Sequence, residues 1–247
     1  MTKEVPEKTT SLVDVRRSDY ADEDIVFYLQ VYQDYALAEW CLGNLKRHYR
    51  GSRVILLSDG DDDPRFEELA GNHPKVEYVC GQRLFPMTHG GAMLHRMLEH
   101  FFRKPAAYLI SIDTDAGFHR RFEYLPTRVG LFGTRQRLSL PDGGYQESIQ
   151  GGFIGYTLSA AGRLFETRVF LAPELLDSRQ TWGRSHWVQE RIARTGLVSK
   201  DWIVGHCAKE LRLPMYTFGE VKSTWNNYVP NDDRRYAVTH PCKDRRL

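Results

Sequence analysis

The stretch YLISIDTDAGF, Tyr108–Phe118, predicts a buried strand that ends in two aspartates, Asp113 and Asp115. Side chains of an extended chain alternate between two faces, so aspartates two residues apart point to the same face. Two carboxylates that close repel each other, and one takes up a proton unless a cation lies between them. Hard oxygen ligands favour Mg²⁺ or Mn²⁺ over Zn²⁺ or Cu²⁺. The pair therefore predicts a divalent-cation site; the alternative is a solvated turn, where aspartate is a common residue.

Strands and helices alternate in the sequence before this stretch. Apolar runs at residues 25–34, 52–60 and 75–81 predict strands, and apolar residues recur at helical spacing in the segments between them. Strands that are apolar throughout favour a mostly parallel central sheet flanked by helices. We expect a single α/β domain over residues 25–247, after a flexible lead-in over residues 1–24.

The composition indicates a globular protein without a strong overall charge. Hydrophobic residues make up 41% of the 247 residues, and the formal net charge of +2 gives no field that would recruit nucleic acid or an anionic membrane. No apolar run approaches the roughly 20 residues of a membrane-spanning helix, and the first residues lack a signal-peptide layout. The four cysteines show no CxxC spacing, which favours small buried thiols over disulfides or a zinc site. We therefore expect a cytoplasmic protein.

Four segments resemble the nucleotide-sugar-dependent glycosyltransferases of the GT-A fold. IVFYLQVYQDYALAEWCLGNL with SRVILLSDG resembles the opening of their nucleotide-binding half, and SIDTDAG is similar to their metal-binding Asp-x-Asp element. GGFIGYTLSAAGRLF with KDWIVGHCAKELRLP resembles the acceptor half of fringe-like and β-galactosyltransferase-type members. THPCK resembles the segment with the late histidine that completes their metal shell.

The resemblance implies a GT-A (Rossmann-like) fold with a nucleotide-binding half at residues 25–120. The acceptor half and a C-terminal metal-ligand tail would occupy residues 121–247. It also implies transfer of a hexose or N-acetylhexosamine from a nucleotide diphosphate, UDP foremost, to a hydroxyl group of a glycan or small molecule.

By this resemblance, Asp113 and Asp115 hold Mn²⁺ or Mg²⁺ and, through the ion, the donor's diphosphate. His240 is the third expected ligand, because a neutral imidazole can complete an oxygen-rich shell. Lys243 could neutralise charge on the diphosphate. The alternatives are a histidine in a flexible tail and a solvated lysine.

Asp201 is the candidate general base, at the start of a predicted helix. The helix dipole would keep it ionised, although a capping aspartate is the alternative reading. A single base opposite the leaving group implies inversion at the anomeric carbon. The sequence departs from the family pattern here, because Lys200 stands where the family has a glutamate.

On the donor side, Asp34 and Asp59 end the first two predicted strands. They are candidates for nucleoside contacts, or simply turn residues. His89 and Arg96 belong to a segment whose glycine pair opens a helix, a ready site for an anion. We expect both to face the nucleotide or donor sugar; a surface helix is the alternative for Arg96.

On the acceptor side, Gly151 and Gly152 would allow close backbone approach beside the acceptor, or form a buried bulge. Trp182 and Trp187 lie in the loosely patterned region before Asp201. Their rings could stack on a sugar, or be buried in the core.

Two rival functions are open. In a phosphohydrolase of the haloacid-dehalogenase kind, the first aspartate of Asp-x-Asp is a nucleophile, but that motif normally ends the first strand, and three predicted strands precede it here. A protein that binds the nucleotide without turnover is the second rival, favoured by Lys200 beside Asp201.

Overall fold

The structure is built around one seven-stranded sheet. The computed structural model describes residues 16–60, 62–84, 89–139, 145–171, 200–224 and 233–242. Among these residues the strand order in the sheet is β10-β8-β9-β5-β2-β3-β4. Four of the neighbouring pairs are parallel, and two, both involving β9, are antiparallel.

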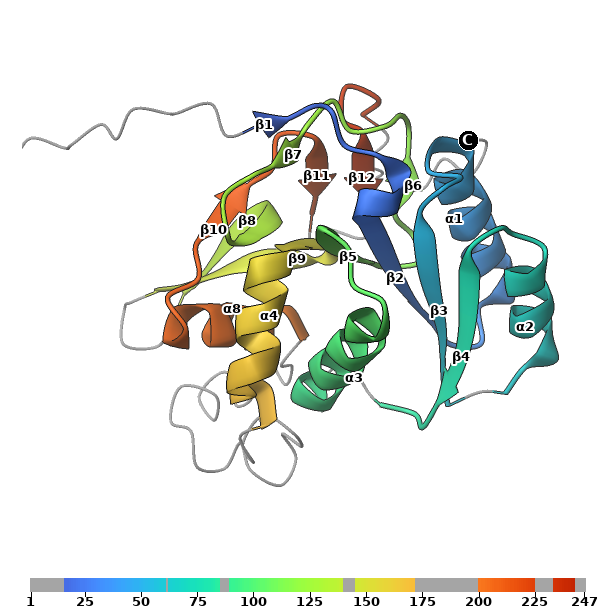
Figure 1. Ribbon diagram of the computed structural model, residues 1–247, viewed down its shortest axis with the longest axis horizontal. Helices are drawn as coiled ribbons and strands as arrows, with labels where there is room; N and C mark the ends of the chain where they lie inside the picture. Colours follow the sequence, from blue (N-terminus) through green and yellow to red (C-terminus); the bar gives the residue numbers. More distant parts are fainter. Residues whose placement is uncertain are drawn as a thin grey trace, which may run out of the picture.

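The residues before the aspartate pair form the parallel half of the sheet (Figure 1). β2 lies between β3 and β5, and β4 forms the edge next to β3. The apolar side chains of β2, β3 and β5 are buried almost throughout, as expected for parallel strands covered on both faces. The strands lie within the predicted runs and are slightly shorter: Ile25–Val31 (β2), Arg53–Asp59 (β3), Val76–Gly81 (β4) and Tyr108–Ile112 (β5).

The antiparallel part of the sheet follows in sequence. β9 (Tyr145–Thr157) pairs antiparallel with β5 and with β8 (Leu131–Ser139), and β10 (Met215–Thr217) runs parallel to β8. Phe153 of β9 lies opposite Ile112 of β5. Because the two strands run in opposite directions, the residues just before Phe153 lie beside the end of β5.

β8 was not predicted from the sequence. Its arginines, Arg135 and Arg137, alternate with less polar residues, and both pair with Glu147 of β9. The β8–β9 register also shifts between Gly133 and Arg135, which interrupts the period of two that a strand pattern needs.

Helices cover both faces of the sheet (Figure 1). α1 (Tyr35–His48) and α2 (Pro64–Gly71) pack on one face. α3 (Gly90–Arg103), α4 (Leu158–Thr167) and α8 (Lys200–Glu210) pack on the other, together with the short turn η2 (Val169–Leu171). The apolar residues of each helix lie on its buried side, which gives the sheet two hydrophobic cores.

Short polar side chains start several of these helices. Asp34 accepts a hydrogen bond from the amide of Leu37, and Asp63 accepts one from the amide of Arg65. Each such cap satisfies an amide that has no partner within its helix and contributes about 1 kcal/mol.

A small sheet joins the C-terminal part of the chain to the middle. β12 (Val238–His240) pairs parallel with β11 (Val221–Ser223) and antiparallel with β6 (Gly117–Phe118). The strand that carries His240 therefore lies next to the strand that follows Asp115.

Defined structure begins before the predicted boundary at residue 25. β1 (Arg16–Arg17) pairs antiparallel with β7 (Leu125–Pro126), and the turn η1 (Asp22–Asp24) leads into β2. Asp22 also accepts a hydrogen bond from the amide of Gly51. Residues 16–24 are therefore part of the folded structure. The expectation of a flexible lead-in over residues 1–24 is wrong for this part of it.

Two expectations from composition can be compared with the structure. No helix in the described part of the chain combines the length and apolar composition of a bilayer-spanning segment. Cys41, Cys207 and Cys242 are buried, as expected, whereas Cys80 is exposed at the edge strand β4.

Candidate metal centre

Asp113, Asp115 and His240 come together at the end of β5. The Asp113 amide donates to the carbonyl oxygen of Gly152 (3.2 Å), which holds the turn after β5 against β9. Nε2 of His240 lies 2.9 Å from Oδ1 of Asp115 and 3.7 Å from Oδ2 of Asp113. One ligand atom from each residue lies within 4.8 Å of the others. The arrangement is the three-residue set that the sequence predicted.

These side chains differ in exposure. The exposed fraction is 46% for Asp113, 26% for Asp115 and 7% for His240. The carboxylates are thus accessible from solvent, while the imidazole is held in the interior. Two carboxylate oxygens and one imidazole nitrogen suit a hard or borderline divalent cation such as Mn²⁺ or Mg²⁺, so the residues present fit such an ion.

A buried hydrogen-bond network fixes the His240 ring. The Ser223 hydroxyl donates to Oε1 of Gln150, and the same oxygen accepts from the amide of Gly152 (2.8 Å). Nδ1 of His240 lies 2.9 Å from Ser223 Oγ. Because the hydroxyl has used its proton, its oxygen accepts from Nδ1–H. In the neutral ring, Nε2 then presents its lone pair to the aspartates, which is the tautomer that a metal ligand requires.

The acidic surroundings change the pKa of His240. Burial on its own lowers the pKa, but the hydrogen bond to Asp115 and the charges of Asp113 and Asp115 outweigh it, so the pKa is raised. The charge of Lys200 opposes this rise. The cluster therefore favours positive charge at the position where a cation would bind.

Gly151 and Gly152 are adjacent in β9 and therefore face opposite sides of the sheet. A Cβ on Gly152 would lie less than 3.0 Å from ring atoms of His240, closer than real Cβ contacts. A Cβ on Gly151 would lie 3.5 Å from Asp201, an ordinary contact. Gly152 is therefore required for the ring to occupy its place, while Gly151 borders the start of α8.

Asp201 lies in the first turn of α8 and is 4% exposed. Its Oδ2 accepts from Nε2 of Gln136 (2.8 Å), and its backbone oxygen accepts from the hydroxyl of Ser148 (2.7 Å). The carboxylate is thus held between β8, β9 and α8, beside Gly151.

Lys200 is a site residue that the sequence did not predict. Its Nζ lies 3.8 Å from Oδ1 of Asp113 and 3.5 Å from Oγ of Ser111. The only signal was the departure from the family pattern next to Asp201. Its contact with Asp113 depends on how α8 packs against the sheet.

Two of the donor-side candidates, Asp59 and Arg96, form a second cluster at the end of β3. Oδ1 of Asp59 accepts from the amide of Leu84 (2.7 Å) and Nη2 of Arg96 (2.9 Å), and Oδ2 accepts from Gln30 (2.9 Å). Both carboxylate oxygens are therefore bonded within the protein. Asp34, the other strand-end candidate, caps α1 as described above.

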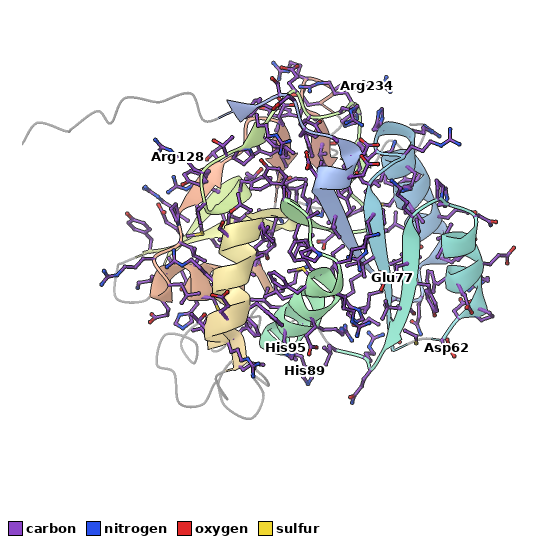
Figure 2. The ribbon with its side chains drawn as sticks, in the orientation of Figure 1. Asp62, Glu77, His89, His95, Arg128 and Arg234 are labelled. Atoms are coloured by element: carbon purple, nitrogen blue, oxygen red, sulfur yellow. The ribbon has the colours of Figure 1, made fainter. Side chains whose placement is uncertain are left out.

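Of the remaining candidates, the structure describes only His89. His89 precedes the first turn of α3, at the N-cap position, and lies at the start of that helix (Figure 2). Trp182, Trp187 and Lys243 lie outside the described residues.

Comparison with known proteins supports the fold. Neither a protein-family model nor a curated protein matches this sequence. Among solved structures, the chain is similar to a mannosyltransferase from Pyrobaculum calidifontis in complex with GDP-Man and Mn²⁺, with 15% identity and a TM-score of 0.50. The match covers 83% of this chain and 57% of that one, so the chain spans little more than half of that protein's length. Together with the sheet described above, this confirms the α/β architecture of the GT-A kind that the sequence predicted.

Proposed function

We propose that this protein is a metal-dependent glycosyltransferase, which moves a sugar from a nucleotide-diphosphate donor to a hydroxyl acceptor. The observation that carries the proposal is the meeting of Asp113, Asp115 and His240 at the end of the central strand β5. In open α/β sheets, ligands bind at this edge. The solved neighbour, which carries GDP-Man and Mn²⁺, supports the same reading.

Asp113, Asp115 and His240 would hold the ion. Mn²⁺ or Mg²⁺, when bound, would supply positive charge for the donor's diphosphate and for its departure. Ser223 and Gln150 orient the His240 ring, and the partial exposure of Asp113 leaves one side of the centre open for a donor.

We assign the role of general base to Asp201. The acceptor oxygen forms a bond to the anomeric carbon, and the bond from that carbon to the diphosphate breaks, with its electron pair going to the departing phosphate oxygen. The proton of the acceptor hydroxyl passes to Asp201, and the configuration inverts. Asp201 is almost fully buried, so this role requires the hydroxyl to approach along the backbone at Gly151, which has no side chain of its own beside the carboxylate.

The finer assignments follow the family resemblance. We propose UDP as the carrier, a fringe-like acceptor half, and contacts from Trp182 and Lys243 to acceptor and diphosphate. GDP is the alternative carrier, because the solved neighbour holds GDP-Man. Asp34, Asp59, His89 and Arg96 would shape the nucleoside side; for Asp59 the role is indirect, since its oxygens are bonded to protein groups.

A thermal-shift screen tests the proposal. UDP-, GDP- and dTDP-sugars are added with and without Mn²⁺, and the melting temperature is measured. A donor at 100 times its dissociation constant adds about 2.7 kcal/mol to the free energy of unfolding. We expect a Mn²⁺-dependent rise with one nucleotide class. No rise with any of them would contradict the proposal.

The variant Asp201→Asn separates transfer from binding. We expect donor binding to be kept while transfer falls roughly 10²-fold or more, the usual loss for a general base. A wild-type protein that binds the donor but transfers to no acceptor would instead favour the binding-only function, which is supported by the lysine at residue 200, directly before Asp201 in the sequence. Hydrolysis of a generic phosphate monoester would favour the phosphohydrolase.

A further inference from the structure

Lys200 places a positive charge beside the candidate metal centre. Its ammonium lies 3.8 Å from Oδ1 of Asp113, the carboxylate whose other oxygen lies 3.7 Å from His240. The Lys200 side chain is only 16% exposed, whereas Asp113 is 46% exposed. The Lys200 side chain is therefore largely covered where it meets Asp113, while Asp113 itself remains accessible to a ligand.

The backbone of Lys200 is fixed by helix packing. A Cβ on Gly90, the first residue of α3, would lie 3.3 Å from Cα of Lys200 and less than 3.0 Å from Ile203. The first turns of α3 and α8 thus approach so closely that a side chain at residue 90 would require Ile203 and the backbone at Lys200 to shift. Lys200 is a largely covered side chain on a fixed backbone, unlike a typical solvated lysine.

Local electrostatics do not favour a lysine at this position. The N-terminal end of a helix carries partial positive charge, which stabilises acidic residues and opposes basic ones. Partial burial adds a desolvation cost for the ammonium. Among the described residues, its polar contacts are Asp113 and Ser111, at 3.8 and 3.5 Å, longer than a charge-assisted hydrogen bond of about 2.7–2.9 Å. An ammonium has three donors, so capacity for an anionic ligand remains.

The charges of the centre suggest which ligand this is. Two carboxylates neutralise one divalent cation, so an ion at Asp113 and Asp115 would leave the negative charge of a diphosphate largely uncompensated. We propose that Lys200 binds the diphosphate of the donor as a second cation next to the ion. This rests on the function proposed above and adds Lys200 to the residues expected to contact the diphosphate.

A consequence is that part of the diphosphate affinity does not need the ion. Lys200 and a divalent cation also share Asp113, so removing the ammonium leaves that carboxylate more available to the ion. The two effects have opposite signs: Lys200→Met should weaken nucleotide binding and tighten binding of Mn²⁺ alone.

Calorimetry with UDP and GDP as probes tests this in the full chain, with Mn²⁺ and with EDTA. We expect the wild type to bind one nucleotide tightly with Mn²⁺ and weakly, but measurably, in EDTA. Lys200→Met should lose binding in EDTA and weaken it about 10- to 100-fold with Mn²⁺, the range for a hydrogen bond to a charged group. Lys200→Arg should retain part of the binding. Lys209→Met, an exposed lysine on the same helix, is the matched control and should behave as wild type.

The outcomes separate this inference from the proposed function. Nucleotide binding by Lys200→Met equal to that of wild type, in both buffers, would overturn the role of Lys200 and leave the glycosyltransferase proposal standing. A wild type that binds neither nucleotide, even with Mn²⁺, would overturn both. Melting temperatures of the variants exclude unfolding as the cause, and a Lys200→Met protein that binds Mn²⁺ alone more tightly than wild type supports the shared carboxylate.

Discussion

Asp113 at the end of β5 and Asp59 at the end of β3 occupy equivalent places in the sheet but have different surroundings. Asp59 is nearly inaccessible, and its oxygens accept three hydrogen bonds at 2.7–2.9 Å, one of them from Arg96. Asp113 is about half exposed, and its charged neighbours, His240 and Lys200, lie at 3.7 and 3.8 Å. The carboxylate of β3 is used within the protein, whereas that of β5 is available to a ligand.

This difference indicates what each cluster contributes. The Asp59–Arg96 pair is neutral, and both carboxylate oxygens of Asp59 are bonded within the protein, so the pair holds the segment after β4 against the end of β3. The β5 cluster has two carboxylates, and a neighbouring imidazole whose pKa they raise, so it stabilises an added cation. Substitutions at the two strand ends should therefore affect different measurements.

The largest expected effect on ion binding comes from Asp113→Asn combined with Asp115→Asn. Removing both charges and both anionic ligands should abolish Mn²⁺ binding, measured by electron paramagnetic resonance of the free ion. Asparagine has the same shape and the side chains are partly exposed, so the melting temperature in EDTA should not fall. Retained Mn²⁺ affinity would show that the ion binds elsewhere.

Gly152→Ala should have the next largest effect. The added methyl group displaces the His240 ring. Mn²⁺ affinity should therefore fall about 10- to 100-fold, the usual loss when a group that orients a metal ligand is changed. Gly151→Ala is the matched control, because its methyl group meets only ordinary contacts. Equal Mn²⁺ affinity in the two variants would contradict the assignment of His240 as a ligand.

Ser223→Ala should have a smaller effect of the same kind. Without the hydroxyl, Nδ1 of His240 loses its partner and the tautomer with a free Nε2 is less favoured, so Mn²⁺ affinity should fall about tenfold. Ser148→Ala, a buried serine of β9 that bonds the backbone at Asp201, serves as the comparison in the same titration. An unchanged affinity in Ser223→Ala would mean that the ring is held by packing alone.

Asp59→Asn should have the smallest effect on the ion, with Mn²⁺ affinity as in wild type. It should instead lower the free energy of unfolding by about 3 kcal/mol, because Arg96 is left without its charged partner in a buried pair. Urea unfolding measures this. Loss of Mn²⁺ binding in a stably folded Asp59→Asn protein would show that the two clusters act as one site.

Much of the parallel half of the fold could be predicted from the sequence. In β2, β3 and β5, apolar side chains cover both faces, so the strand signal does not depend on tertiary partners. β8 could not be predicted in this way. Its arginines are satisfied by Glu147 on the neighbouring strand, and that pairing is invisible to a local pattern.

The candidate site, too, could be predicted only in part. Asp113 and Asp115 follow a strong strand signal, and His240 was expected from the family resemblance. Ser223 and Gln150 lie in no recognisable motif, yet they decide which nitrogen of His240 faces the carboxylates. Lys200 reaches Asp113 through the packing of α8, whose first turn lies against Gly90 of α3.

The pairing of β12 with β6 also sets when the centre can form. The amide of Cys242 donates to the carbonyl oxygen of Asp115 (2.8 Å), so the two ligand-bearing segments are clasped together although one lies near mid-chain and the other near residue 240. A ribosome releases the chain from its amino end, at roughly 5–20 residues per second, and the sheet from β2 to β9 emerges first. The imidazole arrives only after almost all of these residues have been translated. A nascent chain therefore carries the two carboxylates without their third partner, and the three-residue cluster is complete only after His240 has been translated.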